Sequence, residues 1–333
     1  MRGGMKQFVH ASHRFDTRIP TMNRFSFVLR RPIQLIPVLL GISVITFLLL
    51  QMTPGDPVRL MLGPKASQEA IEFVRARYGL DQPVPVQYFY YVMNCLRGDF
   101  GQSIAFRGPV SGVIVARIAP TVFLILYGLV ISLLLTFALA VTAARQRGRW
   151  IDHLIRLLCV AGVGVPSYFV GLLLIMGFCL RLKIFPVSGY GPTFANNLWH
   201  LFLPALTIGI GVTPILARNL RATFIQQMDK DYAVACRSRG LPESYIFSRH
   251  VFWNSLLPTV NLLGVVVAFL IGGTVVVENV FNIPGLGNLL IRGVLTHDQF
   301  VVQAVALLLA VGVVISNFAV DILTAILDPR VKL

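Results

Sequence analysis

The residues of this chain that most readily do chemistry are its histidines and cysteines, and their spacing suits neither catalysis nor metal binding. No pair has the separation of a metal-ligand motif, and no serine, histidine and acidic residue form a hydrolytic arrangement. The chain also lacks the Gly-x-x-x-x-Gly-Lys-Ser/Thr phosphate loop, so any ATP hydrolysis must be done by another chain. The ten residues are His10, His13, His153, His200, His250, His297, Cys95, Cys159, Cys179 and Cys236. We therefore expect no catalytic, cofactor or metal site here.

Four polar side chains lie inside or at the ends of long apolar stretches. Glu278 and Asp321 lie at stretch ends, and a carboxylate at membrane depth is costly and often functional. Either could instead be paired or hydrated at the membrane interface. Asn261 and Asn317 lie within stretches, where an amide can line a path or bond a neighbouring helix. Asn261 and Glu278 are our candidates for a translocation path.

The composition decides what kind of element carries these residues. The chain is 56% hydrophobic and 13% charged, whereas soluble domains have roughly 25% charged residues. A soluble fold of this composition would expose a large apolar surface. Its 23 Phe, 9 Tyr and 3 Trp also exclude a disordered chain. The composition therefore predicts a protein with several membrane spans.

Six largely apolar stretches meet or approach the roughly 20 residues that a helix needs to cross a bilayer. Strands of a membrane barrel would alternate in polarity over about 10 residues, and no stretch does so. The first stretch is too long for a signal peptide, so we expect it to be retained. The fourth, with 17 uncharged residues, is the shortest. The predicted fold is an all-α membrane protein with transmembrane helices at 33–52, 118–144, 154–180, 201–218, 256–278 and 301–323.

The distribution of basic residues predicts the orientation of these helices. Of the 29 Lys and Arg, 19 lie in the segments on the same side as the two termini. Basic loops stay in the cytoplasm, so the tails 1–32 and 328–333 and the loop 219–255 should be cytoplasmic. This bias accounts for much of the net charge of +15 without a nucleic-acid partner.

The loop 53–117 should then lie outside the cytoplasm. In its residues 68–78, apolar and charged residues are spaced as in a short amphipathic helix, which Gly79 would cap. The aromatic run 88–91 suits a membrane interface. We interpret the loop as a packed cap, with direct substrate binding as the alternative.

The loop 219–255 has the most informative pattern. Residues 231–239 permit a helix, Gly240 suits the left-handed position just past a helix end, and Pro242 suits the first turn of the next helix. The pattern predicts two short helices with a sharp bend at Gly240-Leu241. The second carries several large apolar residues, including Tyr245 and Trp253, which could lie on the bilayer or dock into a groove of another protein.

At this segment the chain resembles the permease subunits of ABC importers, whose cytoplasmic "EAA" loop contains a fixed glycine, here Gly240. The Glu-Ala-Ala triplet falls on residues 234–236, where only Ala235 matches. The resemblance is closest to the dipeptide/oligopeptide branch, which reads Asp-Tyr, Gly-Leu, Arg-His, Asn and Leu-Pro. This chain has Asp231-Tyr232, Gly240-Leu241, Arg249-His250, Asn254 and Leu257-Pro258.

The resemblance continues from about residue 22 to the end, in the same order as in the branch. One departure is Asp298-Gln299-Phe300, where the branch usually has Asp-Tyr-Pro, and residues 1–21 have no counterpart. The matching motifs are Pro54-Gly55-Asp56-Pro57, 78–83, Gly98-Asp99-Phe100-Gly101, Pro284-Gly285-Leu286-Gly287, Val301-Val302-Gln303 and Asp328-Pro329-Arg330.

The resemblance implies the fold of an ABC type I importer permease, with a five-helix core over residues 118–327 in the bacterial cytoplasmic membrane. It implies a homologous second permease, two ATPase subunits that use ATP and Mg, and an extracytoplasmic substrate-binding protein. The residues it assigns to ATPase coupling are Asp231, Tyr232, Ala235, Gly240, Leu241, Ser244, Arg249, His250, Asn254 and Pro258.

The cargo that the resemblance implies is a di- or oligopeptide. Permeases of the same branch also carry nickel, glutathione or sugar oligomers, and these remain alternatives. A stand-alone secondary transporter would show an inverted repeat and charges at midspan, and an intramembrane enzyme would need a catalytic dyad. The sequence shows no inverted repeat, no charges at midspan and no such dyad.

Overall fold

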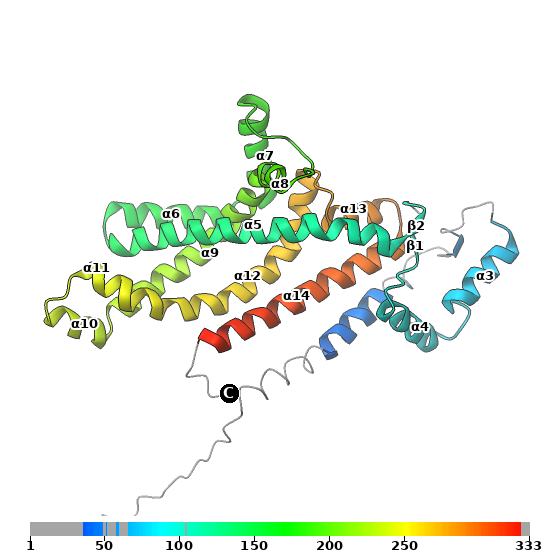
Figure 1. The fold of residues 1–333 in the computed structure, drawn as a ribbon, viewed down its shortest axis with the longest axis horizontal. Helices are drawn as coiled ribbons and strands as arrows, with labels where there is room; N and C mark the ends of the chain where they lie inside the picture. The colour runs from blue at the N-terminus through cyan, green and yellow to red at the C-terminus, as the bar shows by residue number, and fades with distance from the viewer. Residues whose placement is uncertain (1–35, 49–50, 52–57, 60–65, 104, 328–333) are drawn as a thin grey trace, which may run out of the picture.

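The computed structural model describes residues 36–48, 51, 58–59, 66–103 and 105–327. Its first long element is the apolar helix Ile36–Leu48, so the rest of the predicted span 33–52, residue 51 apart, lies outside the described residues. Helices α3 (Gln68–Tyr78) and α4 (Val84–Leu96) follow, and then a hairpin of β1 (Gln102–Ser103) and β2 (Gly108–Pro109). These short elements lie together at one end of the molecule (Figure 1).

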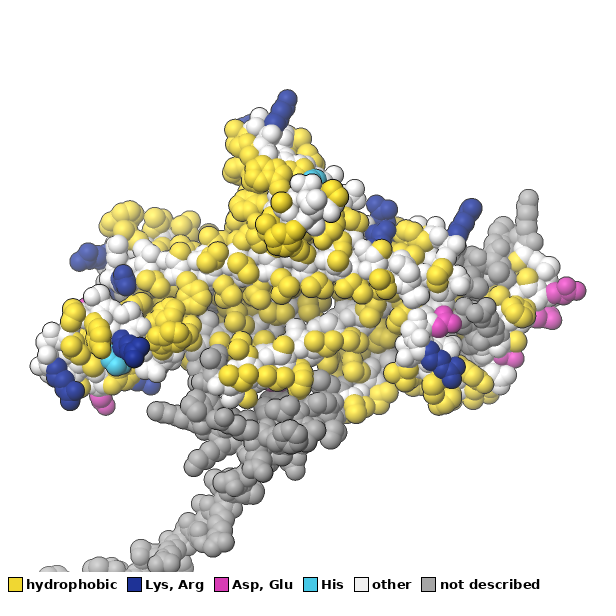
Figure 2. All heavy atoms as spheres, viewed as in Figure 1, with side chains coloured by type: hydrophobic (Ala, Val, Ile, Leu, Met, Phe, Trp, Pro, Cys, Tyr) yellow, Lys and Arg dark blue, Asp and Glu magenta, His cyan; other side chains and the backbone are white. Residues whose placement is uncertain are grey.

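The body of the molecule is a bundle of long helices. Helices α5 (Val110–Arg145), α6 (Trp150–Gly164), α9 (Phe202–Met228), α12 (Phe252–Val280) and α14 (Gln299–Leu327) run side by side along its long axis (Figure 1). Figure 2 shows hydrophobic side chains over the middle of this bundle, with Lys and Arg toward its ends. Four of these helices, α5, α9, α12 and α14, are long and apolar enough to cross a membrane.

Helix α9 corresponds to the least apolar predicted span and occupies the centre of the bundle. It packs against α5, α6, α12 and α7 (Ser167–Leu174), and most of its apolar stretch is buried. Because other helices surround it, α9 needs less apolar surface than a lipid-facing helix. The helix continues to Met228, beyond residue 218 where the predicted span ends.

The predicted transmembrane helix 154–180 is not continuous in the structure. Helix α6 ends at Gly164, and the segment formed by α7 and the π-helical η1 (Ile175–Arg181) leaves it at an angle of 103°. Pro166 explains the break, because proline has no N–H for the helix ladder and its ring disfavours the α-helical conformation at Val165. The segment projects sideways from the bundle beside α8 (Phe194–His200) (Figure 1).

The other boundaries differ by smaller amounts. Helix α5 begins at Val110, so residues 110–117 of the predicted loop belong to the helix. Helix α12 continues without interruption from the segment before it, and Pro258 lies within it. A further short helix, α13 (Leu286–Leu295), packs between α12 and α14.

Glycines allow α5 and α9 to approach closely. A Cβ added at Gly128 of α5 would lie 2.8 Å from Ile208 of α9, and one at Gly209 of α9 would lie 2.8 Å from Ile131 of α5. Each glycine therefore accepts an isoleucine from the facing helix. Such small-residue contacts are how membrane helices gain packing without a hydrophobic driving force.

In the loop before α5, the structure has the short helix that the sequence predicts. Helix α3 has the predicted bounds, and Gly79 caps it with a φ of +65°. The hairpin is tied to α14 by the carboxylate of Asp298, which accepts hydrogen bonds from Ser103 Oγ at 2.6 Å and the Ala105 N–H at 3.0 Å. Close by, Gly101 lies against the ring of Phe300. The motif that departs from the branch therefore joins the hairpin to the bundle.

Candidate functional site

The predicted bend in the loop 219–255 is confirmed. Helix α10 (Asp231–Ser238) is followed by Arg239 and then by Gly240, whose φ is +78°, and α11 (Glu243–Ile246) begins three residues after Gly240. The Gly240 N–H donates to the Arg237 carbonyl at 2.9 Å, and the Leu241 N–H donates to the Cys236 carbonyl at 3.2 Å. This pair of bonds is the Schellman motif, which satisfies the last carbonyls of a helix.

The apolar face of the second helix packs on its own chain. Helix α11 continues through the π-helical η2 (Phe247–Val251) into α12. Ile246, Phe247 and Val251 are buried against α5 and α9, and the Arg145 guanidinium lies 5.1 Å from the Phe247 ring centre. The large apolar side chains left exposed in this segment are Val234, Leu241, Tyr245 and Trp253. One face of the segment is thus buried against the bundle, and the other face is exposed on the surface.

The predicted coupling residues divide into two groups. Tyr232 and His250 are half-buried, with ring centres 6.4 Å apart, and the Tyr232 hydroxyl donates to Gln227 Oε1 at 3.0 Å. The others lie on the surface at the end of the bundle. They are Asp231, Ala235, Gly240, Leu241, Ser244, Arg249, Asn254 and Pro258. The structure therefore brings the family-derived residues together on one exposed end.

Arg237 is a residue of this segment to which the sequence analysis assigned no role. Its Nη1 donates to the Met228 carbonyl at 3.0 Å, and its Nε and Nη2 donate to the Glu243 carboxylate at 2.5 and 3.3 Å. The Arg237 guanidinium holds the pKa of Glu243 below its ordinary value, and the same bond raises the pKa of Arg237. The signal in the sequence was the pair of opposite charges on either side of Gly240-Leu241-Pro242.

Two further ion pairs at this end also lacked a clear sequence signal. Asp152 is buried, and its carboxylate accepts from Arg221 Nε at 2.6 Å and Nη2 at 2.7 Å, which joins α6 to α9. Arg147 Nη1 donates to both Asp229 oxygens at 2.9 and 3.0 Å on the surface. These partners are 69 and 82 residues apart, so only the tertiary fold pairs them.

Glu278, one of the two predicted path residues, is held by hydrogen bonds inside the bundle. The side chain is fully buried, and its carboxylate accepts from Thr121 Oγ1 at 2.6 Å and from the Asn288 N–H at 3.0 Å. The Gly287 N–H also donates to it. A carboxylate at the start of α13 satisfies N–H groups that have no partner within the helix. Glu278 therefore caps α13 and ties it to α5.

The amides inside the spans contact neighbouring helices. Asn261 Oδ1 of α12 accepts from Thr324 Oγ1 of α14 at 3.0 Å. Asn317 of α14 lies near Gly264 of α12, where an added Cβ would be 3.7 Å from its Oδ1. Of the alternatives for these amides, the observed contacts favour helix pairing.

A hollow of about 350 Å³ opens between the α6–α7 break, α9 and α12. Neither Asn261 nor Glu278 lines it. Its lining is apolar apart from Ser167, and Val265 and Phe269 of α12 are strongly exposed beside it. It offers no charged group to a solute.

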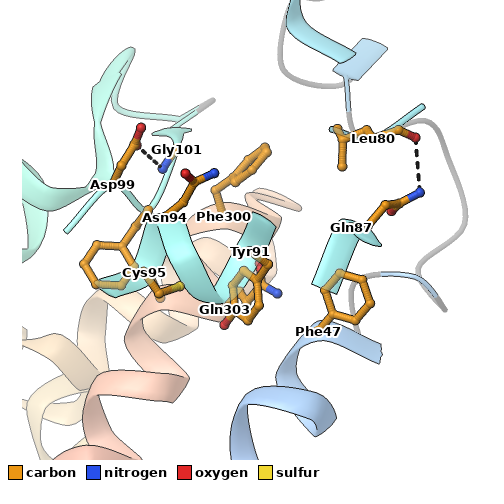
Figure 3. A pocket seen from close by; sticks show the side chains of 12 residues that line it. Phe47, Leu80, Gln87, Tyr91, Asn94, Cys95, Asp99, Gly101, Phe300 and Gln303 are labelled. Carbon is orange, nitrogen blue, oxygen red and sulfur yellow. Dashed lines mark hydrogen bonds between the residues drawn. The ribbon is translucent and has the colours of Figure 1, made fainter. Parts of the chain in front are cut away.

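A second cavity, of about 50 Å³, lies at the opposite end from α10 (Figure 3). Residues of α4, including Tyr91 and Cys95, face Gln303 of α14 and Phe47 of the first helix across it. Burial raises the pKa of the Cys95 thiol to about 11. All four cysteines are free, and among the described residues no three His, Cys, Asp or Glu form a group that could hold a metal ion.

An apolar helical bundle with an exposed, bent segment at one end defines the chain as a multi-pass membrane protein. Residues 136–333 match the family described as binding-protein-dependent transport system inner membrane component, and residues 24–125 match the N-terminal region of that family. The chain belongs to this family. It is a permease subunit of an ABC importer in the bacterial inner membrane.

Two curated relatives are the glutathione transport system permease proteins GsiC of Escherichia coli K12 and Salmonella typhimurium. Each is 38% identical over 308 residues, which is 92% of this chain and 99% of the relative. A structure of the MetNI methionine ABC transporter in an inward-facing conformation matches with a TM-score of 0.55 and 16% identity. The match covers 65% of this chain and 96% of the MetNI chain, and it supports the fold.

Proposed function

We propose that this permease imports small peptides, and that ATP hydrolysed by partner subunits drives the import. The observation that carries the proposal is the 38% identity to glutathione permeases over 92% of the chain. Glutathione is itself a tripeptide, so it belongs to the cargo class that the Asp231-Tyr232 to Leu257-Pro258 pattern implies. Nickel and sugar oligomers have no such support.

The exposed segment α10–Gly240–α11 is the proposed contact with the ATPase. Val234, Leu241 and Tyr245 offer apolar surface there, and Arg239 and Arg249 add positive charge. An exposed helix with apolar anchors fits a groove on another protein. Because η2 and α12 continue directly from α11, a displacement of this segment acts directly on a membrane helix.

The remaining partners follow from the family. The proposed assembly contains a second, homologous permease, two ATPase subunits and a binding protein that delivers the peptide from outside the cytoplasm. In this orientation both termini and the α10–α11 end are cytoplasmic, and α3, α4 and the β1–β2 hairpin face outward.

The apolar hollow between α6, α9 and α12 lacks charges that would select peptides by their side-chain charge.

The test is purification from native membranes in mild detergent, followed by uptake measurements. We expect a second permease and phosphate-loop ATPases to co-purify, and reconstituted vesicles with the binding protein to accumulate labelled glutathione or dipeptides only with internal ATP and Mg. Unlabelled peptides should compete, whereas nickel or a sugar oligomer should not. A chain that purifies alone and transports with an ion gradient would overturn the proposal.

A further inference from the structure

The guanidinium of Arg237 contacts three consecutive elements. The guanidinium donates to the Met228 carbonyl, at the last residue of α9. Arg237 itself lies on α10, and its carboxylate partner Glu243 is the first residue of α11. These bonds span the Gly240 turn. One side chain therefore connects the end of α10 and the start of α11 to the end of α9.

Few other contacts fix the position of α10. Ala233 is its one buried residue, and Tyr232 and Cys236 are partly packed against the cluster beneath. A Cβ placed at Gly240 would meet nothing within 4 Å, so no neighbouring side chain braces the turn. By contrast, the helix after the turn is anchored by Ile246, Phe247 and Val251. The angle between α10 and α11 thus depends strongly on polar bonds.

Arginine is suited to this task in a way that lysine is not. Its planar fork can donate in parallel to both oxygens of a carboxylate while another N–H reaches a carbonyl. Lysine keeps the charge but is a point donor on a flexible stem. The Met228 carbonyl also belongs to the end of α9, where positive charge is favourable.

We infer that Arg237 is a positioning residue for ATPase coupling: its guanidinium holds the end of α9 and the start of α11 together so that the bent segment moves as one body. The inference rests on the proposed coupling role of this segment. Force applied at Leu241 or Tyr245 would then reach α9 and α12 together. Without the guanidinium, the Gly240 turn would absorb part of the displacement.

Arg147 provides a matched control for a surface ion pair. Its Nη1 donates to both Asp229 oxygens at the same end of the bundle, and the two side chains are 51% and 57% exposed, compared with 35% and 60% for Arg237 and Glu243. Asp229 comes before α10, so this pair does not span the turn. Surface ion pairs of this kind contribute little to stability, and equal effects of the two pairs would indicate no special role for Arg237.

The experiment compares Arg237→Ala, Arg237→Lys and Arg147→Ala in the purified assembly with its ATPases and binding protein. We expect both Arg237 variants to lower the solute transported per ATP by about fivefold, the scale of losing the net contribution of one hydrogen bond. Assembly and basal ATP hydrolysis should be retained, and Arg147→Ala should keep the ratio of the unmodified protein. Unchanged coupling in Arg237→Ala, full rescue by lysine, or an equal loss in Arg147→Ala would overturn the inference.

A distance measurement supplies a readout that general destabilisation would not produce. Ser238 and Ser248 are exposed on either side of the turn, and spin labels at cysteines placed there, in a chain without its four native cysteines, report the α10–η2 distance. The distribution should broaden in Arg237→Ala and stay narrow in Arg147→Ala. A Gly240→Val variant distinguishes the coupling role of the segment from the positioning role of Arg237. If Gly240→Val transports normally, the proposed coupling role is wrong. If Gly240→Val loses coupling but the Arg237 variants do not, only the positioning role is wrong.

Discussion

At the residue scale, Gly240 shows why a small residue can matter where space is plentiful. Nothing lies within 4 Å of the position of its missing Cβ, so packing does not require glycine. The backbone conformation requires glycine instead, because its φ of +78° lies in the left-handed region, where a β-branched residue is strained. The residue therefore sets the direction in which the chain leaves α10.

Replacing Gly240 by valine should uncouple transport while the chain still inserts and assembles. The left-handed conformation costs a residue with a Cβ about 1–3 kcal/mol, so the turn should rearrange and displace Leu241 and Tyr245. The measurement is ATP-dependent uptake by a variant with normal expression in the membrane.

Gly148 is the control for this change. It has a φ of +76°, open space around its Cβ position and a place at the same end of the bundle, but outside the bent segment. Gly148→Val should suffer similar backbone strain and keep its coupling. Normal uptake by a well-expressed Gly240→Val variant would contradict the coupling role.

Thr121 is a second residue-scale case, because its hydroxyl joins two buried groups. It donates to Glu278 at 2.6 Å and accepts from the Leu286 N–H at 2.7 Å. Thr121→Val keeps the shape but removes one of the donors to Glu278 and leaves the Leu286 N–H without this acceptor, which costs about 1–3 kcal/mol for the unsatisfied N–H. We expect a clearly lower melting temperature of the purified protein.

Thr142→Val on the same helix is the control, since Thr142 is exposed and bonds only the Ala138 carbonyl one turn earlier. It should melt like the unmodified protein. The same assay checks the assignment of Glu278. A cap predicts that Glu278→Ala lowers the melting temperature, whereas a path residue would alter uptake with stability unchanged.

At the element scale, the α5–α9 contact depends on two reciprocal glycine–isoleucine pairs. Gly128→Val would force a side chain into Ile208, and such overpacking costs about 1–3 kcal/mol. We expect a lower melting temperature, partly restored by adding Ile208→Ala. Gly272→Val, at an exposed position of α12 with open space, should change the melting temperature little. Equal losses at both glycines would exclude close helix approach as the cause.

At the scale of the whole molecule, the charge distribution predicts which end faces the cytoplasm. In a background without native cysteines, Phe73→Cys on α3 and Ser238→Cys on α10 place exposed thiols at opposite ends. A membrane-impermeant maleimide should label position 73 in right-side-out vesicles and position 238 in inside-out vesicles. The reverse pattern would overturn the orientation and with it the cytoplasmic placement of the coupling segment.

Local signals in the sequence determined a large part of this protein. Composition and apolar run length set the class, because a helix must be long and apolar to cross a bilayer. Helix caps are equally local, so the bounds of α3 and the bend at Gly240 could be predicted from a few neighbouring residues. The family pattern could predict a coupling segment because the residues of the pattern are close together in the chain.

Only the tertiary structure decided the contacts between distant residues. The pairing of Asp152 with Arg221 and the capping of α13 by Glu278 depend on how helices pack, and no local pattern encodes these partners. The same is true of α9, whose low hydropathy reflects its central position, and of the α6–α7 break, whose 103° angle is not specified by Pro166 alone. Hydropathy records how apolar a segment is, whereas the neighbours that surround it decide what its polar groups do.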